Sequence, residues 1–340
     1  MLVTGGSGFI GHNLVKALLH TGHQVNIIDI IPNDDTRVRA LSEMGANYFQ
    51  GDIRDFESVL QAGEGCTHVV HLAAQTSVPL SVENPTLNDD ININGTQNII
   101  RYVNSNNIKK VVFASSAAVY GNCDLMPLKE ESAGDCLSPY AESKFKNERD
   151  LLSQVDANSE VHILRFFNVY GPGQGVDSNY AAVIPSFIDK VISGKELTIF
   201  GDGKQSRDFV EVSDVVSFIE LILSHQQAMP NGVYNVATQN QKTILNLAEI
   251  ICDSVAKIDD KLLDVVIVKQ FPKWKIPFFL FKMRTGTIHL SEYVQIIRTK
   301  ENPKKELIKR FKLSDLQSEA ILNMKLGSLK KLEELSTKEE

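Results

Sequence analysis

Cysteine is scarce in this sequence: there are four, and no two of them form a Cys-x-x-Cys pair. Zinc sites and disulfide frameworks need cysteines at short, repeated spacings, so we expect neither, and scattered cysteines favour a reducing compartment such as the cytoplasm. Long apolar runs are also missing, because no stretch approaches the roughly 18 residues that a membrane span needs. The chain opens directly on a predicted strand and a glycine loop, so we expect no signal peptide.

An excess of positive charge is absent as well. The 340 residues carry a net charge of −7 at pH 7, which argues against a general polyanion binder. Residues 282–340 differ from the rest, since they carry 13 basic and 9 acidic side chains, a net charge of +4 against −11 for residues 1–281. Hydrophobic residues make up 43% of the chain and charged residues 23%, which are ordinary values for a folded protein. The length predicts two lobes.

Short β-branched runs alternate with longer amphipathic stretches over residues 1–165. The predicted strands are Leu2–Thr4, Gln24–Ile30, Tyr48–Phe49, His68–His71, Lys110–Ser115 and Val161–Phe166. The predicted helices include Gly11–Leu19, Asp55–Gln61, Asn88–Ser105 and Pro139–Ser153. This alternation predicts a Rossmann-type, doubly wound parallel sheet that binds ligands at the carboxyl ends of its strands. From about Gly171, glycine and proline interrupt the pattern, which indicates a second, smaller α/β lobe.

A glycine-rich loop, Thr4–Gly11, follows the first predicted strand and opens a helix. Gly5 would make the tight turn, Gly8 would let the backbone approach a pyrophosphate, and Gly11 would let helix and strand pack closely. The helix N-terminus would add unpaired N–H groups and a partial positive charge. Asp29 closes the second strand, where a ribose-hydroxyl acceptor is expected. The alternative is a glycine-rich turn that holds no ligand.

The residues after Asp29 bear on the choice of dinucleotide. Asp29, Asp34 and Asp35 would repel a 2′-phosphate, so NAD is favoured over NADP. Arg37 is the one nearby residue that argues the other way.

Tyr140 and Lys144 stand four residues apart on a predicted helix, so both side chains face the same way. A tyrosine with an ordinary pKa near ~10 is a poor base at neutral pH. An adjacent ammonium, together with the positive charge of an oxidised nicotinamide, is expected to lower that pKa. The preceding segment, Ser115–Gly121, supplies a hydroxyl that can bond the same substrate oxygen. The alternative is a surface tyrosine beside a solvent-reaching lysine.

Together these motifs resemble the extended short-chain dehydrogenase/reductase family, specifically its nucleotide-sugar epimerases. The resemblance runs from Met1 to about Asp253, with a weaker trace to about Gly286. The matching segments, in order, are Thr4–Gly11, Gly51–Ile53, His71–Ala74, Asn92–Thr96, Ser115–Gly121, Tyr140 with Lys144, Arg165–Pro172, Gly201–Gly203 and Ser206–Phe209.

The resemblance implies NAD as the cofactor and assigns the residues around it. They are Gly5, Gly8, Phe9, Ile10, Gly11, Asp29, Asp52, Ile53, Leu72, Ala73, Ala74, Asn92, Tyr140, Lys144 and Phe167. Asp52 and Ile53 would hold the adenine. Asn92 would brace the active site near the cofactor, and its alternative is a helix cap or turn residue. The implied catalytic residues are Ser116, Tyr140 and Lys144.

The resemblance also implies a UDP-sugar substrate, bound by Ser116, Tyr140, Asn168, Ala182, Val183, Arg207 and Arg284. Asn168 and Arg207 would meet the diphosphate, which suits the fork of donors on a guanidinium. The alternative for Arg207 is a surface ion pair with Asp208. The segment Tyr180–Pro185 is similar to one that cradles uracil, although its apolar residues are equally typical of a core.

Two alanines narrow the expected reaction. Dehydratases of the family need a carboxyl pair just after the catalytic hydroxyl, and decarboxylases usually carry a carboxylate there, whereas this chain has Ala117 and Ala118. What remains is epimerisation at C4 of a UDP-hexose (UDP-glucose and UDP-galactose, or their N-acetyl forms) through a 4-keto sugar. The enzymatic alternative is another NAD-dependent nucleotide-sugar oxidoreductase.

The last segment differs from the family. Residues 287–340 resemble part of the coiled-coil and lower-gate region of the topoisomerase A proteins, found in bacterial topoisomerase IV and gyrase. Ser314 with Gln317 predicts a helix start, and Gly327 a helix end. The alternative is an ordinary amphipathic helix. Because none of the topoisomerase's cleavage segment is present and a charge run is usually a solvated face, we expect no nucleic-acid partner.

The predicted organisation is therefore a NAD-binding domain over residues 1–168 with a return segment near 205–228, a substrate lobe over 169–286 and a helical tail over 287–340. A family-type homodimer is compatible with it, and a membrane partner is not expected. Two non-enzymatic alternatives stay open: a catalytically impaired dinucleotide-binding protein, suggested by the short first strand and the replaced end, and a topoisomerase-like assembly module.

Overall fold

The computed structural model describes residues 1–123, 125–175, 182–224 and 230–256, the strands at 266–270 and 280–282, and positions 305 and 309. Contacts divide the chain into two units. The first comprises Met1–Ala181 with Asp208–Gln241, and the second comprises Ala182–Arg207 with Lys242–Glu340. The domain boundaries at 168 and 286 stay predictions. Arg284 and the predicted helix of the tail lie outside the described residues.

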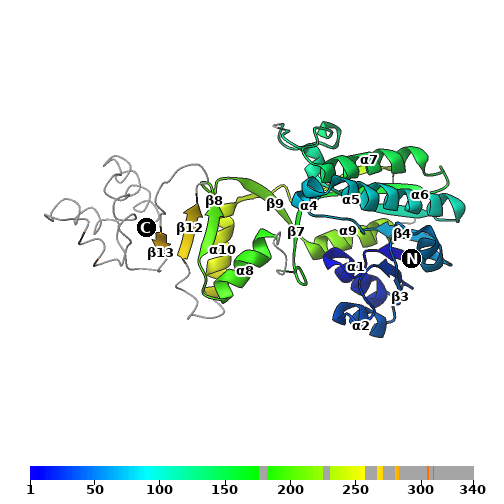
Figure 1. Ribbon diagram of the computed structural model, residues 1–340, viewed down its shortest axis with the longest axis horizontal. Coiled ribbons are helices and arrows are strands. Elements are labelled where there is room, and N and C mark those ends of the chain that lie inside the picture. Colours follow the sequence, from blue (N-terminus) through cyan, green and yellow to red (C-terminus); the bar gives the residue numbers. More distant parts are fainter. Residues whose placement is uncertain are drawn as a thin grey trace. The chain divides into compact units, whose positions relative to one another are not determined.

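A seven-stranded sheet forms the centre of the first unit, in the order β10-β6-β5-β4-β1-β2-β3 (Figure 1). Its strands are β1 (Leu2–Thr4), β2 (Asn26–Asp29), β3 (Asn47–Gln50), β4 (His68–His71), β5 (Lys110–Ser116), β6 (Glu160–Phe166) and β10 (Gly232–Val236). Every neighbouring pair is parallel. The strand order reverses between β1 and β4, so ligands are expected at the carboxyl ends there. The predicted Rossmann-type sheet is confirmed.

Helices cover both faces of this sheet (Figure 1). The α-helices of the first unit are α1 (Phe9–His20), α2 (Thr36–Glu43), α3 (Phe56–Gly63), α4 (Val78–Glu83), α5 (Pro85–Asp89), α6 (Gly95–Ser105), α7 (Pro139–Gln154) and α9 (Val212–Ser224). A π-helical turn η1 (Asp90–Asn94) and 3-10 turns η2 (Ala117–Tyr120) and η3 (Glu130–Ser132) interrupt them. A small parallel pair joins β7 (Asn168–Tyr170) to β9 (Ser206–Glu211).

Alternation along the strands explains the two cores. Val3, Val112 and Leu164 pack with α1, α2 and α9 on one face. Their chain neighbours Leu2, Val111 and Ile163 pack with α3, α6 and α7 on the other. Successive side chains of a strand point to opposite faces, so a strand with no polar position must be covered twice.

The six predicted strands correspond to β1–β6, and the four predicted helices are present with shifted ends. Other details differ. The named helices did not include α2 or α4, and the single helix expected over Asn88–Ser105 is instead broken into the end of α5, the π turn η1 and α6. A π turn adds a residue to one helical turn, which hydrophobic spacing does not reveal.

The second unit is a smaller α/β assembly. Helix α8 (Val183–Ile192) and α10 (Ile244–Ala256) accompany β8 (Leu197–Phe200), β11 (Gln241–Thr243), β12 (Val266–Gln270) and β13 (Leu280–Lys282). Strand β12 pairs with β8 in parallel and with β13 antiparallel. Among the described residues, no helix is long and apolar enough to cross a membrane.

Candidate active site

The glycine loop joins β1 to α1, and two of its glycines have no room for a side chain. Gly5 has φ +69°, and a Cβ there would lie 2.8 Å from the backbone N of Ala73. A Cβ on Gly11 would lie 2.2 Å from the carbonyl oxygen of Gly5. The first contact explains the tight turn, and the second explains how closely α1 approaches the loop.

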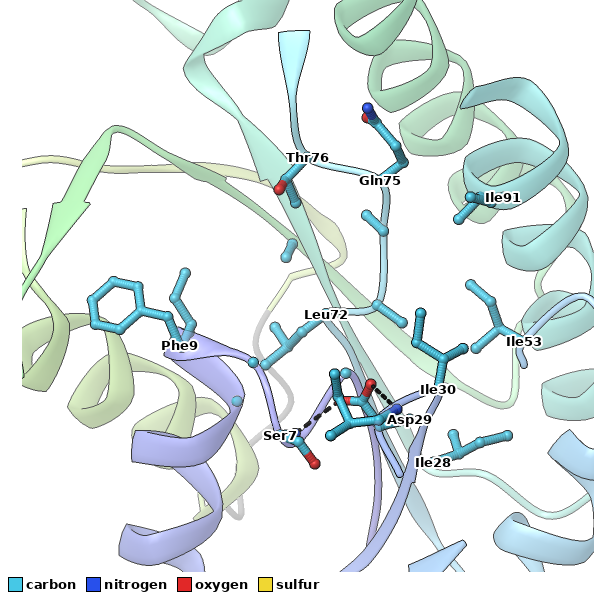
Figure 2. A pocket seen from close by; sticks show the side chains of 18 of the residues that line it. Ser7, Phe9, Ile28, Asp29, Ile30, Ile53, Leu72, Gln75, Thr76 and Ile91 are labelled. Atoms are coloured by element: carbon cyan, nitrogen blue, oxygen red, sulfur yellow. Dashed lines mark hydrogen bonds between the residues drawn. The ribbon is translucent and has the colours of Figure 1, made fainter. Parts of the chain in front are cut away.

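A cleft of about 780 Å³ opens at the carboxyl ends of the strands in the first unit. Every residue predicted to hold the cofactor lines it except Asn92: Gly5, Gly8, Phe9, Ile10, Gly11, Asp29, Asp52, Ile53, Leu72, Ala73, Ala74, Tyr140, Lys144 and Phe167. Ser116 lines it too. Figure 2 shows part of this wall, with Phe9 on one side of the cleft and Ile53 and Ile91 on the other.

Asp29 is held in place at the end of β2. Its Oδ2 accepts a hydrogen bond of 2.9 Å from the backbone N–H of Ser7, and its Oδ1 accepts one of 3.4 Å from Ile31 (Figure 2). The hydroxyl of Tyr48 donates to the carbonyl of Ile31 at 2.5 Å and so fixes the chain that follows. The carboxylate therefore stands beside the glycine loop with a set orientation.

Asp52 is held by Arg54, whose Nη2 lies 2.7 Å from Oδ2 of Asp52 while Nη1 lies 2.8 Å from Oδ2 of Asp90. The hydrogen bond from this guanidinium holds the pKa of Asp52 below its usual value. Ile53 packs against Gly95, where a Cβ would come within 2.5 Å of the Ile53 side chain. This arrangement keeps Asp52 ionised at the cleft wall.

A buried polar network supports the loop after β4. The hydroxyl oxygen of Thr4 accepts hydrogen bonds from the backbone N–H groups of Leu72 and Ala73, at 3.2 and 3.1 Å. The same oxygen lies 2.7 Å from Nδ1 of His71, whose Nε2 lies 3.1 Å from the hydroxyl of Thr96. Burial lowers the pKa of His71 to about 3. The imidazole is therefore neutral and acts as a fixed link.

Asn92 has a different position from the one implied by its inclusion among the cofactor-binding residues. It is buried in the π turn η1 and does not line the cleft. Its Oδ1 accepts from the N–H of Gln75 at 2.8 Å, and its Nδ2 donates to the carbonyl of Gln75 at 3.0 Å. Nδ2 also lies 3.2 Å from the hydroxyl of Ser143 on α7. Asn92 thus fastens the loop after β4 to α7, and its side chain does not cap a helix.

Helix α7 begins so that Tyr140 and Lys144 reach the cleft. Ser138 caps the helix by accepting from the N–H of Ala141 at 3.2 Å, and Pro139 starts it. Tyr140 is 8% exposed and Lys144 is 3% exposed. Nζ of Lys144 donates to the carbonyl of Ala114 at 2.8 Å and lies 5.9 Å from the centre of the Tyr140 ring. The alternative of a surface tyrosine and a solvent-reaching lysine is wrong.

Burial governs the charge of both groups. It raises the pKa of Tyr140, and a hydrogen bond with the side chain of Ser116 acts in the opposite direction. Burial lowers the pKa of Lys144 to about 7, opposed by the negative charge of Glu148. Without a cofactor, desolvation disfavours both charged forms. The predicted lowering of the Tyr140 pKa also requires the positive charge of an oxidised nicotinamide, so it stays a prediction.

The predicted substrate-binding residues are spread over the two units. Asn168 is exposed, donates to the carbonyl of Asp208 at 2.8 Å and does not line the cleft. Ala182 caps α8, Val183 begins it, and Arg207 lies in the second unit. Nη1 of Arg207 donates to the carbonyl of Ser206 at 2.8 Å. The ion pair with Asp208 is not among those of the described residues.

Several lining residues were not predicted. Gln75, Thr76, Ile91 and Gln174 all contribute to the cleft wall. Gln75 and Thr76 could have been predicted from their position in the sequence, since they directly follow the predicted lining segment at 72–74. No local signal marks Gln174.

The cleft suits a dinucleotide on its own geometry. Gly8 is the N-cap of α1 and offers no side chain to bond the first N–H groups of the helix, which leaves them for an anion. Asp29 supplies an acceptor for a ribose hydroxyl. The Oε1 atoms of Gln75 and Gln174 are buried without a hydrogen-bond partner in the described part of the chain, and both residues line the cleft. These groups fit a polar ligand with a pyrophosphate and ribose hydroxyls.

Comparison with known proteins agrees with this geometry. Residues 1–237 match the model of the NAD dependent epimerase/dehydratase family. The chain belongs to that family. It is 32% identical to a UDP-glucose 4-epimerase of Lactobacillus helveticus over 266 residues, which cover 73% of this chain and 79% of the relative. The predicted family and its cofactor, NAD, are confirmed.

Two solved epimerase structures are similar throughout most of the chain. One is a UDP-N-acetylglucosamine 4-epimerase of Methanobrevibacter ruminantium in complex with UDP-N-acetylmuramic acid, with 35% identity, a TM-score of 0.70 and coverage of 84% of this chain and 86% of that one. The other is a UDP-glucose 4-epimerase of Thermotoga maritima with UDP-glucose, with 29% identity, a TM-score of 0.71 and coverage of 80% and 86%. The topoisomerase-like character of residues 287–340 stays a prediction.

Proposed function

We propose that this family member interconverts UDP-hexoses that differ in configuration at C4, with UDP-glucose and UDP-galactose or their N-acetyl forms as substrates. The observation that carries the proposal is the convergence of Ser116, Tyr140 and Lys144 on the wall of the dinucleotide cleft. Three groups from two elements, β5 and α7, meet there in a buried site.

Each of the three side chains has a proposed task. When bound, NAD supplies the acceptor for the hydride that leaves C4 and the donor for the hydride that returns. The Tyr140 oxygen takes the proton of the C4 hydroxyl as that hydride leaves, and gives the proton back as the hydride returns to the opposite face. Ser116 holds the same sugar oxygen by a hydrogen bond. The positive form of Lys144 stabilises the phenolate of Tyr140.

The turn after Ser116 supports epimerisation over the other reactions of the family. Ala117 and Ala118 stand in η2, directly beyond the catalytic hydroxyl. Neither side chain can take a ring proton or protonate a departing hydroxyl, and dehydration requires both steps. The 4-keto sugar is therefore proposed to return to the alcohol.

Asn168 and Arg207 are proposed to bind the diphosphate, and Ala182 and Val183 the uridine, with Arg284 as a further contact. The exposed guanidinium of Arg207 supports its role, since it pairs with no carboxylate in the described residues.

The four cysteines are free thiols, which supports the proposed cytoplasmic location. The proposal also includes a homodimer, and no contact of the described residues is assigned to its interface.

Incubation of the full chain with NAD and each of the four UDP-sugars, followed by separation of the products, tests the proposal. The expected result is interconversion within one C4 pair with no accumulation of reduced cofactor. Stoichiometric reduction of NAD without an epimer would favour the oxidoreductase alternative. Tight NAD binding with no turnover of any of the four sugars would favour the impaired dinucleotide-binding protein.

A further inference from the structure

The start of α2 places a guanidinium on the same cleft wall as Asp29. Asp35 is the N-cap of α2, and its Oδ1 accepts from the backbone N–H of Arg37 at 2.8 Å. Arg37, the second residue of α2, lines the cleft together with Asp29. The link between β2 and α2 is fixed, because the hydroxyl of Tyr48 bonds the carbonyl of Ile31 within it.

Asp35 also holds the guanidinium of Arg37 by two further contacts. Its Nε donates to Oδ1 of Asp35 at 3.1 Å, and its Nη2 donates to Oδ2 at 3.2 Å. The carboxylate therefore caps the helix and occupies one side of the guanidinium fork at the same time. The hydrogen bond from Arg37 keeps the pKa of Asp35 below its usual value, so the pair is ionised at neutral pH.

The charges on this wall decide which dinucleotide it suits. An adenosine ribose with a free 2′-hydroxyl needs an acceptor, which Asp29 provides. A 2′-phosphate needs a cation, and a guanidinium fork is the donor set that suits it. Asp35 engages two of the donors of Arg37 and offsets its charge, so the guanidinium offers less positive charge to a ligand beside Asp29. A phosphate would have to displace Asp35 and then stand beside two carboxylates.

We infer that Asp35 is a positioning residue that sets cofactor selectivity: by holding Arg37 it withholds the guanidinium from a 2′-phosphate and keeps the cleft selective for NAD over NADP. Arg37 is thus a latent phosphate-binding group. The inference concerns the adenosine end of the cleft and does not rest on the proposed sugar chemistry, so binding alone tests it.

The test compares NAD and NADP binding to the full chain with Asp35→Asn, measured by calorimetric titration. Asparagine keeps the capping oxygen but not the charge. NADP affinity is expected to rise by about tenfold, the effect of one charge-assisted contact worth roughly 1.4 kcal/mol, while NAD affinity is unchanged. Because Asp29 remains, the selectivity falls without inverting. The matched control is Asp55→Asn, which alters the N-cap of α3, a residue that does not itself line the cleft, and is expected to change neither affinity.

A second pair of variants separates release of Arg37 from a mere loss of negative charge. In the unaltered background Arg37→Met is expected to give no gain in NADP affinity, since it removes no carboxylate and leaves Asp35 without its partner. In the Asp35→Asn background the same substitution is expected to abolish the tenfold gain, and raising the ionic strength to weaken it. The inference is overturned if Asp35→Asn binds NAD normally but gains no NADP affinity, or if the gain survives the loss of Arg37.

Discussion

At the scale of the residue, burial determines what Tyr140 and Lys144 can do. Spacing of four on a helix predicted that the two would face the same way. The structure places Lys144 Nζ 5.9 Å from the centre of the Tyr140 ring and Tyr140 in hydrogen-bond contact with Ser116. The sequence could not show that both are almost fully buried, because burial depends on strands and helices far away in the chain. The same limit applies to Asn92, whose motif indicated a place near the cofactor but not that its amide is consumed by Gln75 and Ser143.

The buried lysine predicts a specific dependence of stability on pH. The pKa of Lys144 falls from 10.5 to about 7 on folding, so the unfolded chain binds more protons than the folded protein between these pH values. The contribution of Lys144 to the free energy of unfolding therefore rises with pH across this range. Relative to Lys144→Met, the free energy of unfolding of the unaltered protein should increase by about 2 kcal/mol between pH 7 and pH 9. Urea unfolding of both proteins at the two pH values measures it. If the free energies of unfolding of the two proteins changed in parallel with pH, that result would contradict the lowered pKa of the buried Lys144 amine.

At the scale of the element, β5, β6 and α7 are joined behind the catalytic groups by a buried ion pair. Nη2 of Arg165 lies 2.6 Å from Oε2 of Glu148, and each side chain is 3% exposed. Glu148 also accepts from the hydroxyl of Ser115, and Arg165 donates to Tyr120 at 3.0 Å. Hydrophobic periodicity predicted these three elements well but gave no sign of this pair, since charged residues on a helix are normally assigned to its solvent face.

Glu148→Gln is expected to destabilise the protein by about 3–5 kcal/mol, because it leaves the guanidinium of Arg165 buried without its counter-charge. The control is Lys146→Met, which removes the exposed Lys146–Asp150 pair of the same helix and should cost less than about 1 kcal/mol. Urea unfolding at neutral pH compares the two. Equal, small effects would show that the Glu148–Arg165 pair is solvated and not structural.

At the scale of the whole molecule, the strand order concentrates the cofactor residues in one unit. The cleft-lining residues all belong to the first unit, whereas Ala182, Val183 and Arg207 belong to the second. The β-α alternation predicted the first arrangement, because parallel strands bring their carboxyl ends to one edge. A return segment near 205–228 was also predicted for this domain. In the structure Asp208–Gln241 belongs to the first unit through tertiary contacts, whose extent the sequence pattern does not define.

This division predicts that the two ligands can be weakened separately. Arg207→Met is expected to weaken binding of a UDP-sugar by about tenfold or more, since it removes a charge-assisted contact to the diphosphate, and to leave NAD affinity unchanged. Lys204→Met is the control, because it removes an exposed positive charge from the same unit. Separate titrations of NAD and UDP-glucose measure both. Equal losses for the two variants would reduce the role of Arg207 to general electrostatic attraction.

The proposed role of Tyr140 as the proton acceptor at C4 is tested most directly by Tyr140→Phe, assayed for interconversion of UDP-glucose and UDP-galactose alongside a titration of NAD. Removing the hydroxyl deletes the proton acceptor and leaves the ring that lines the cleft. The account predicts that interconversion falls by at least about a hundredfold while NAD affinity is retained. Undiminished interconversion in that variant would contradict it.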